Sequence, residues 1–140
     1  MDKDFKSLIV WRESKRLAVS IYFLTETFPP REKFGLVDQM RRAGVSVASN
    51  IAEGHDRTTE KEFSRFLDYS SGSLAELETQ LLIATDVHFV SEIQLEKLTI
   101  QIQAIRNMLR KLKQKLASSD RFEIRESSDS NPYGDDIYLP

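Results

Sequence analysis

The sequence predicts an all-α fold: an antiparallel, up-down-up-down four-helix bundle over residues 1–117, followed by a flexible acidic tail over residues 118–140. Apolar residues recur at three- and four-residue steps through four long segments, which is typical of amphipathic helices. The chain has only five Gly and four Pro in its 140 residues, which favours long regular elements over many turns. The linkers between the segments are short, so sequential helices should be antiparallel neighbours.

The first helix is expected to begin after Ser7, a residue type that often serves as an N-cap, and to run to about Phe28. Pro29 and Pro30 should end it, because neither ring can continue the hydrogen-bond ladder. The apolar row that should face the core consists of Leu17, Ile21, Leu24 and Phe28.

The second helix is expected over about Leu36–Glu53. It is apolar on two faces and rich in small residues, and such a helix is usually buried on more than one side. Gly54 follows directly and is predicted to be the C′ residue that caps the helix.

The third helix is predicted to open with a capping box formed by Thr59 and Glu62 and to continue to about Val87. The run 70–73, Ser-Ser-Gly-Ser, lies in its middle, where such residues are poor helix formers. The run either lets a neighbouring helix approach closely or marks a local distortion. A second capping box, Ser91 with Gln94, should open the fourth helix, whose apolar residues form three heptads before the chain turns polar after residue 117.

The composition argues against an enzyme with a recognisable site. The chain has no Cys, which excludes disulfides, zinc-thiolate sites and thiol nucleophiles. A di-iron bundle needs Glu-x-x-His motifs, but Ala52 and Thr85 stand three residues before the two histidines, His55 and His88. Glycine-rich phosphate loops are also missing from the sequence. We therefore expect no enzymatic activity, no cofactor, no metal site and no small-molecule substrate. A monomeric bundle enzyme with unrecognised chemistry stays an alternative.

Charge is distributed unevenly along the chain. Residues 118–140 hold six acids and two bases, a net of −4, and removing these from the total of 22 acids and 20 bases leaves residues 1–117 at +2. No stretch approaches the roughly 18 apolar residues that a membrane-spanning helix needs. The short apolar run near the N-terminus is followed by charges and does not resemble a signal peptide. We expect a cytoplasmic protein without membrane contact.

A polar face on the second helix is the first candidate site. Its members recur at i, i+4, i+7 or i+8, and i+11, namely Arg42, Ser46, Ser49 or Asn50, and Glu53. This face is either a solvated stripe, with Asp38 and Arg42 as an exposed i,i+4 pair, or a subunit interface bridged by Arg42 and Glu53. Because the rest of the helix is apolar and small, we favour the interface.

A basic run on the fourth helix is the second candidate, with no acid between residues 97 and 119. Such a run can contact phosphates without reading sequence. It can equally offset the helix macrodipole and keep the surface soluble. The acidic tail would compete for the same charges. The run comprises Arg106, Arg110, Lys111, Lys113 and Lys115.

Four segments together resemble a known family: VWRESKRLA at 10–18, FPPREKFGL at 28–36, QMRRAGVSVASNIAEGHDR at 39–57 and EFSRFLDYSSGSLAELETQL at 62–81. They are similar to the four-helix-bundle family of 23S rRNA intervening-sequence proteins, over about residues 5–116. That family in turn resembles the accessory protein of diversity-generating retroelements. The resemblance implies a ring-shaped homopentamer with a central channel, and contact with RNA or DNA rather than catalysis.

The resemblance also implies which residues build the assembly. The residues that fall on the family's motifs are expected to be interface or architecture residues: Arg42, Ser46, Asn50, Glu53, Gly54, Gly72, Ser73, Glu76 and Glu78. The chain departs from the family pattern at Gly44, where alanine is common, and in its long acidic tail. The alternative function is a protein-interaction scaffold that uses the ring surface and the tail, whose last eight residues include Tyr133, Ile137, Tyr138 and Leu139.

Overall fold

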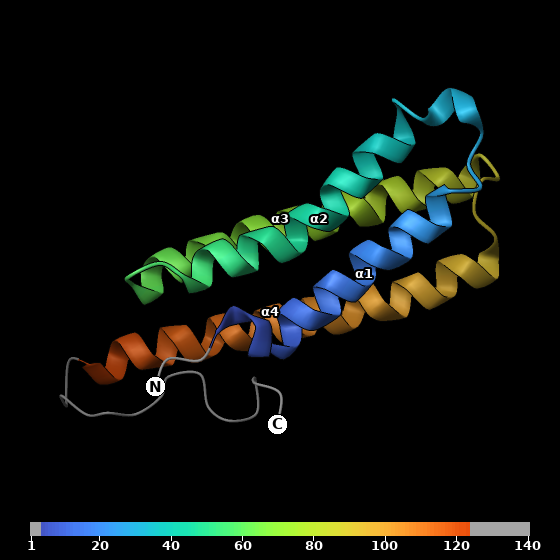
Figure 1. The fold of residues 1–140 in the computed structure, drawn as a ribbon. Helices are drawn as coiled ribbons and strands as arrows, with labels where there is room; N and C mark the ends of the chain where they lie inside the picture. The colour runs from blue at the N-terminus through green and yellow to red at the C-terminus, as the bar shows by residue number, and fades with distance from the viewer. Residues whose placement is uncertain (1–3, 124–140) are drawn as a thin grey trace.

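The computed structural model describes residues 4–123, with side chains up to Ser118. This part of the chain contains four α-helices, α1 (Ile9–Thr25), α2 (Leu36–His55), α3 (Glu60–Asp86) and α4 (Glu92–Glu123), and two short 3-10 helices, η1 (Phe5–Ser7) and η2 (Pro30–Glu32). Figure 1 shows the helices packed as a bundle, in which each runs antiparallel to the one before it. The predicted all-α four-helix bundle is confirmed.

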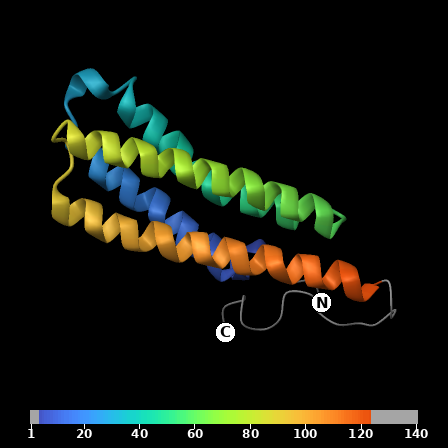
Figure 2. The same cartoon turned by 180° about the vertical axis from the view of Figure 1, so that it is seen from behind.

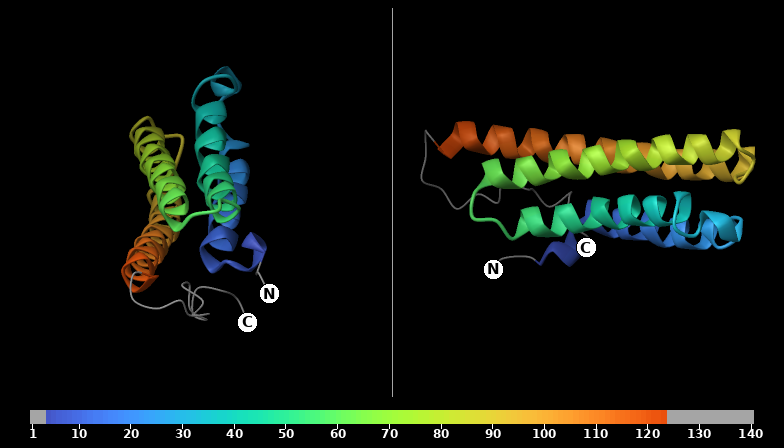
Figure 3. Two further views of the ribbon diagram at one scale, coloured as in Figure 1. Left: turned by 90° about the vertical axis from the view of Figure 1, so that its left-hand side faces the viewer. Right: turned by 90° about the horizontal axis from the view of Figure 1, so that it is seen from above.

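The bundle consists of two helical hairpins laid against each other. Seen along its length, α1 and α2 form one side and α3 and α4 the other (Figure 3). The most extensive packing joins the hairpins through α2 and α3, and among the neighbouring helices α1 and α4 share the least. Figure 2 shows α3 and α4 side by side with the α1–α2 hairpin behind them. The core is built from the apolar rows of all four helices, with Leu17, Ile21, Met40, Ile51, Phe63, Leu67, Leu74, Leu77, Leu81, Ile102 and Ile105 among its fully buried members.

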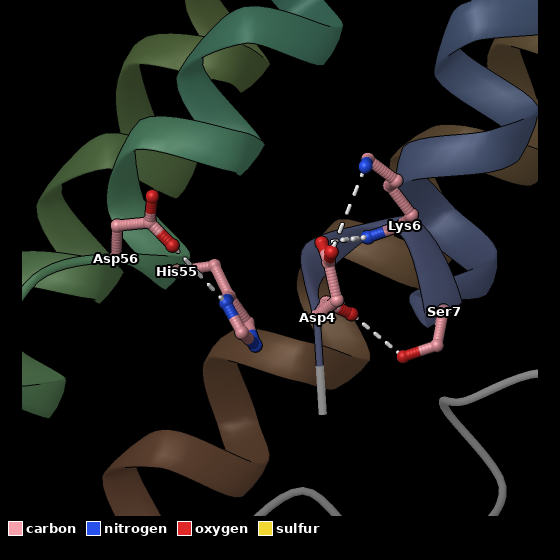
Figure 4. A network of polar contacts seen from close by, with 5 residues as sticks. All are labelled: Asp4, Lys6, Ser7, His55 and Asp56. Carbon is pink, nitrogen blue, oxygen red and sulfur yellow. Dashed lines mark hydrogen bonds and ion pairs between the residues drawn. The ribbon is translucent and has the colours of Figure 1, made fainter. Parts of the chain in front are cut away.

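The start of α1 differs from the prediction. Leu8 is the N-cap and makes no side-chain capping bond, so Ser7 as the N-cap was wrong. Instead the Asp4 carboxylate accepts a bond from the Lys6 amide at 3.1 Å, and the Ser7 hydroxyl donates to the Asp4 carbonyl at 2.6 Å (Figure 4). These bonds fix η1, whose chain must turn before α1 can begin.

The first helix also ends earlier than expected, at Thr25 rather than Phe28. The residue before a proline disfavours the helical conformation, so the chain leaves the helix ahead of Pro29. The Thr25 hydroxyl donates to the Ile21 carbonyl at 2.7 Å and accepts a bond from Arg41 Nε of α2 at 2.9 Å. The end of α1 is therefore tied to the neighbouring helix.

The predicted role of Gly54 as a C′ cap was wrong, because α2 continues to His55 and takes Asp56 as its C-cap. Gly54 is instead buried inside the last turn, where a Cβ would lie 2.6 Å from Phe66 Cβ. The glycine thus lets α2 and α3 approach closely. His55 packs edge-on against the Phe63 ring, with centroids 5.8 Å apart, and its Nδ1 lies 3.7 Å from an Asp56 carboxylate oxygen (Figure 4).

The serine–glycine run of α3 causes no break, since the helix is continuous from Glu60 to Asp86. Ser70 is fully buried and donates to the Val47 carbonyl of α2 at 2.7 Å, so this serine serves close helix approach, as one of the two alternatives predicted. At the N-terminus of α3, Thr59 Oγ1 accepts from the Glu62 amide at 3.2 Å, so the predicted cap is present, but this is only one of the two bonds of the predicted capping box among the described residues.

The turn between α3 and α4 is closed by local bonds. His88 adopts a left-handed φ of 67°, and the Phe89 amide donates back to the Ala84 carbonyl at 2.8 Å, an arrangement that often ends helices. The capping box predicted for α4 is present: the Ser91 amide donates to Gln94 Oε1 at 2.9 Å, and the Gln94 amide donates to Ser91 Oγ at 3.2 Å.

The fourth helix runs to Glu123, six residues beyond the boundary at 117 that the sequence predicts. The rest of the predicted acidic tail, residues 124–140, lies outside the described residues. Within the described part, none of the helices combines the length and the apolar character that crossing a membrane requires.

Candidate functional site

Part of the predicted polar face of α2 forms hydrogen bonds within the chain. Ser46 Oγ lies 2.8 Å from Ser73 Oγ of α3, and Asn50 Nδ2 donates to the Ser46 carbonyl at 2.9 Å and to its hydroxyl at 3.0 Å. All three side chains are half-buried along the seam between the helices. The structure therefore brings these three predicted interface residues together as a polar seam, which joins α2 to α3.

The charged residues of the same face lie outside this seam. Arg42 Nε donates to Asp38 Oδ2 at 3.0 Å, the i,i+4 pair of the solvated alternative, and the Arg42 side chain is 80% exposed. Glu53 and Glu76 are exposed. Glu76 accepts a bond from Gln80 Nε2 at 3.3 Å, whereas Glu53 has no ion pair with any residue in the described part of the chain. Within one chain, no contact joins Arg42 to Glu53.

Gly72 differs from the other helical glycines because packing within the chain does not require a glycine at this position. It is exposed in the middle of α3, and a Cβ built there would meet no described atom within 4 Å. Tyr69 and Ile83, also on α3, are large apolar residues that are each about half exposed. A glycine at such a position costs a helix roughly 1 kcal/mol relative to alanine.

Cations in the basic run of α4 form ion pairs with α3. Arg106 Nη2 donates to Glu78 Oε1 at 2.9 Å, and Lys113 forms an ion pair with Asp68. These two cations join α4 to α3 and are partly neutralised by their partners. We refer to the remaining exposed pair, Arg110 and Lys111, as the α4 basic edge; neither has an ion pair with a described residue. Lys115 is half-buried on the next turn.

A third charged surface lies on α1, and the sequence reasoning missed it. Lys6, Arg12, Lys15 and Arg16 surround Trp11 and line one open groove. The signal was present in the segment VWRESKR, which places three cations within five residues of the single tryptophan of the chain. Basic residues interleaved with aromatic ones are typical of nucleic-acid-binding surfaces.

The comparison with protein families decides the identity of this bundle. The family model of the 23S rRNA-intervening sequence proteins matches residues 6–111. The chain belongs to this family. All the helix-to-helix contacts described above, except those beyond residue 111 of α4, fall inside the matched region.

A solved structure supports the fold of this 23S rRNA-intervening sequence protein. It is the crystal structure, at 1.70 Å resolution, of a protein of unknown function from the S23 ribosomal protein family of Bacteroides thetaiotaomicron VPI-5482. The two chains share 22% sequence identity with a TM-score of 0.65, over 72% of this chain and 94% of the other. At this level of identity the likeness shows the fold alone. No curated protein matches the chain.

Neither the family description nor the solved structure names an enzymatic activity. Among the described residues of this family member, no three His, Asp or Glu side chains gather closely enough to hold a metal ion. The features that remain as candidate sites are surfaces: the outer face of α2 and α3 around Gly72, the α4 basic edge, and the groove on α1.

Proposed function

We propose that this protein is a non-enzymatic homo-oligomer that binds RNA or DNA through phosphate contacts. The observation that carries the proposal is the α4 basic edge, where Arg110 and Lys111 stay exposed while Arg106 and Lys113 are engaged by α3. The family is described by reference to an intervening sequence of 23S rRNA, which makes RNA the first ligand to test.

Binding at the α4 basic edge should be independent of base sequence and sensitive to salt. Exposed lysine and arginine attract phosphates electrostatically, and each phosphate they neutralise releases condensed counterions. The two ion pairs to α3 contribute indirectly, because they hold the helix that presents Arg110 and Lys111. The edge by itself gives affinity and leaves base specificity to other contacts.

A salt series of RNA-binding measurements tests this role. The double variant Arg110→Gln/Lys111→Gln is expected to weaken binding of a structured RNA about 10-fold at low salt and to lower the slope of log affinity against log salt by about 2. The matched control is Lys61→Gln/Arg65→Gln, which removes two exposed cations from α3. A gel shift without any complex at micromolar protein and low salt would refute the proposal, and equal losses in the two double variants would refute the role of the edge.

The homo-oligomer is supported by the outer face of α2 and α3. An exposed glycine in the middle of a helix lowers the stability of the chain. Its presence is explained if a partner outside the chain occupies the space that a side chain would fill. Gly72, with the exposed Tyr69 before it and Ile83 after it on the same helix, leaves room in this area of α3 for a second copy to approach. Arg42, Glu53 and Glu76 would flank this area, and the family resemblance implies five copies in a ring.

Light scattering on a Gly72 variant tests the interface. Gly72→Leu is expected to reduce the mass in solution from that of five 16.2 kDa chains towards one, because the new side chain blocks close approach. Its melting temperature as a separated chain should stay equal or rise, since leucine is the better helix former. Gln103→Leu adds the same side chain to the exposed side of α4 and should leave the mass unchanged. An oligomer of undiminished mass with Gly72→Leu would contradict this interface.

A further inference from the structure

The outer side of α1 carries an open groove of about 660 Å³. Its lining comes mainly from successive turns of α1, with Lys6 of η1 at one end and Gln101 of α4 on the wall. Trp11 and Phe23 lie twelve residues apart on the helix, which corresponds to about 18 Å along its axis. We call this surface the α1 groove. Its length suits an extended ligand better than a single small molecule.

The charges of the α1 groove favour an anionic ligand. Four cations and no acid line it. Arg16 is paired with Glu13 at 2.9 Å, and Lys6 lies 3.7 Å from Asp4 just outside the lining. Arg12 and Lys15 have no carboxylate partner among the described residues. These two side chains are therefore available to phosphates.

The groove is also aromatic and apolar, which sets it apart from the α4 basic edge. The Lys15 ammonium lies over the Trp11 ring at 5.7 Å from its centroid, and the Phe5 ring packs edge-on against the same indole at 5.1 Å. Phe23 is 67% exposed, so its ring is open to a flat partner. Base–aromatic stacking contributes to binding with little dependence on sequence, since every base has a π-face.

A buried polar atom on the groove wall lacks a partner. Gln101 Oε1 is shielded from solvent and makes no hydrogen bond within the described part of the chain. Buried acceptors in folded proteins are nearly always bonded, and an exception calls for an explanation. Because this oxygen is shielded from solvent, a ligand in the groove reaches it only if the Gln101 side chain rotates.

We infer that the α1 groove binds single-stranded nucleic acid, with phosphates on Arg12 and Lys15 and a base against the Phe23 ring. The inference rests on the proposed function, and it assigns the binding of single-stranded nucleic acid to this groove. A duplex would satisfy the cations but keep its base faces stacked and out of reach. An anionic membrane would match the cations and the apolar residues as well, so anionic vesicles are one arm of the test below.

The single tryptophan makes the test site-specific, because all indole fluorescence of the protein comes from Trp11. A single-stranded RNA of about 10 nucleotides should quench this emission in a saturable titration. Binding is followed in parallel by the anisotropy of a dye on the RNA. We expect the same strand annealed into a duplex to bind at least about 5-fold more weakly at the groove.

Two variants separate stacking from charge. Phe23→Leu keeps an apolar side chain at an exposed position but removes the ring, and we expect a loss of about 5- to 30-fold in affinity for the single strand only. Arg12→Gln/Lys15→Gln should lower affinity about 10-fold and reduce the salt slope by about 2. Circular dichroism confirms that each variant keeps its helices.

The possible outcomes are distinguishable. RNA that binds by anisotropy while Trp11 emission stays constant would place binding elsewhere, which overturns the groove and leaves the proposed function standing. Equal affinities for the strand and the duplex, unchanged by Phe23→Leu, would mean that the groove contacts phosphates only. This result would also overturn the inference. A blue shift of Trp11 with phosphatidylglycerol vesicles, without any response to RNA, would assign the groove to membranes. Absence of RNA binding in every assay would refute both proposals.

Discussion

Gly54→Ala is expected to lower the free energy of unfolding by about 1–3 kcal/mol, the range for overpacking a closely packed interior. The added Cβ would lie 2.6 Å from Phe66 Cβ and 3.2 Å from a ring carbon of Phe63. Phe66 Cβ is fixed to the backbone of α3, so it cannot swing away as the end of a long side chain can. Relief therefore requires α2 and α3 to move apart at their shared end. Urea denaturation followed by circular dichroism measures the loss.

Gly44→Ala is the matched control on the same helix. Its Cβ would lie 3.5 Å from Ala18 Cα and 3.7 Å from Ala18 Cβ, which is ordinary van der Waals contact. The substitution should therefore be neutral or stabilising by up to about 1 kcal/mol, because alanine is the better helix former. A comparable loss of stability in both variants would show that the contact with Phe66 is not the cause.

Ser14→Ala is expected to raise the free energy of unfolding by about 1–2 kcal/mol. Ser14 is fully buried on α1, and its hydroxyl has no hydrogen-bond partner in the described part of the chain. Burying a hydroxyl without a partner costs about 1–3 kcal/mol, so removing it should recover much of that cost. Alanine also has the higher helix propensity. Thermal unfolding and urea denaturation should both report the gain.

Ser70→Ala, the same substitution at another fully buried serine, should have the opposite sign. The Ser70 hydroxyl donates to the Val47 carbonyl at 2.7 Å, a bond between α3 and α2 whose loss should cost about 1 kcal/mol. The difference between the two variants isolates the effect of hydrogen-bond satisfaction from that of helix propensity. Destabilisation by Ser14→Ala would mean that this hydroxyl has a partner after all.

The fold was predictable because its signals are local. The apolar rows that contain Leu17 and Ile21 lie in the core as expected, and the Ser91–Gln94 box opens α4. The errors at Ser7 and Gly54 have a common origin. Both residues are good capping types, but a competing bond to Asp4 in one case and close packing against Phe66 in the other decided their roles. Neither factor can be read from residue preference at the helix end.

The candidate surfaces were predictable only in part. The Asp38–Arg42 pair spans one helical turn and could be anticipated. The partners of Arg106 and Lys113 are 28 and 45 residues distant in the sequence, so helical periodicity does not reveal them. The α1 groove was overlooked for a different reason: a segment rich in lysine and arginine looks like an ordinary solvated helix face until the positions of Trp11 and Phe23 are known.

The two ion pairs between α3 and α4 have a consequence for how the chain finds a single alignment. The apolar residues of α4 repeat every seven positions, so sliding the helix by one heptad along α3 would still place leucine against leucine. Arg106 and Lys113 are themselves seven residues apart, so a slide of one heptad carries one of these cations to the carboxylate of the other. The second carboxylate is then left without a cation, and a slide in either direction loses one of the two ion pairs. Each pair contributes at most about 1 kcal/mol. Together they favour one alignment of α4 along α3 over others that the apolar core would stabilise equally.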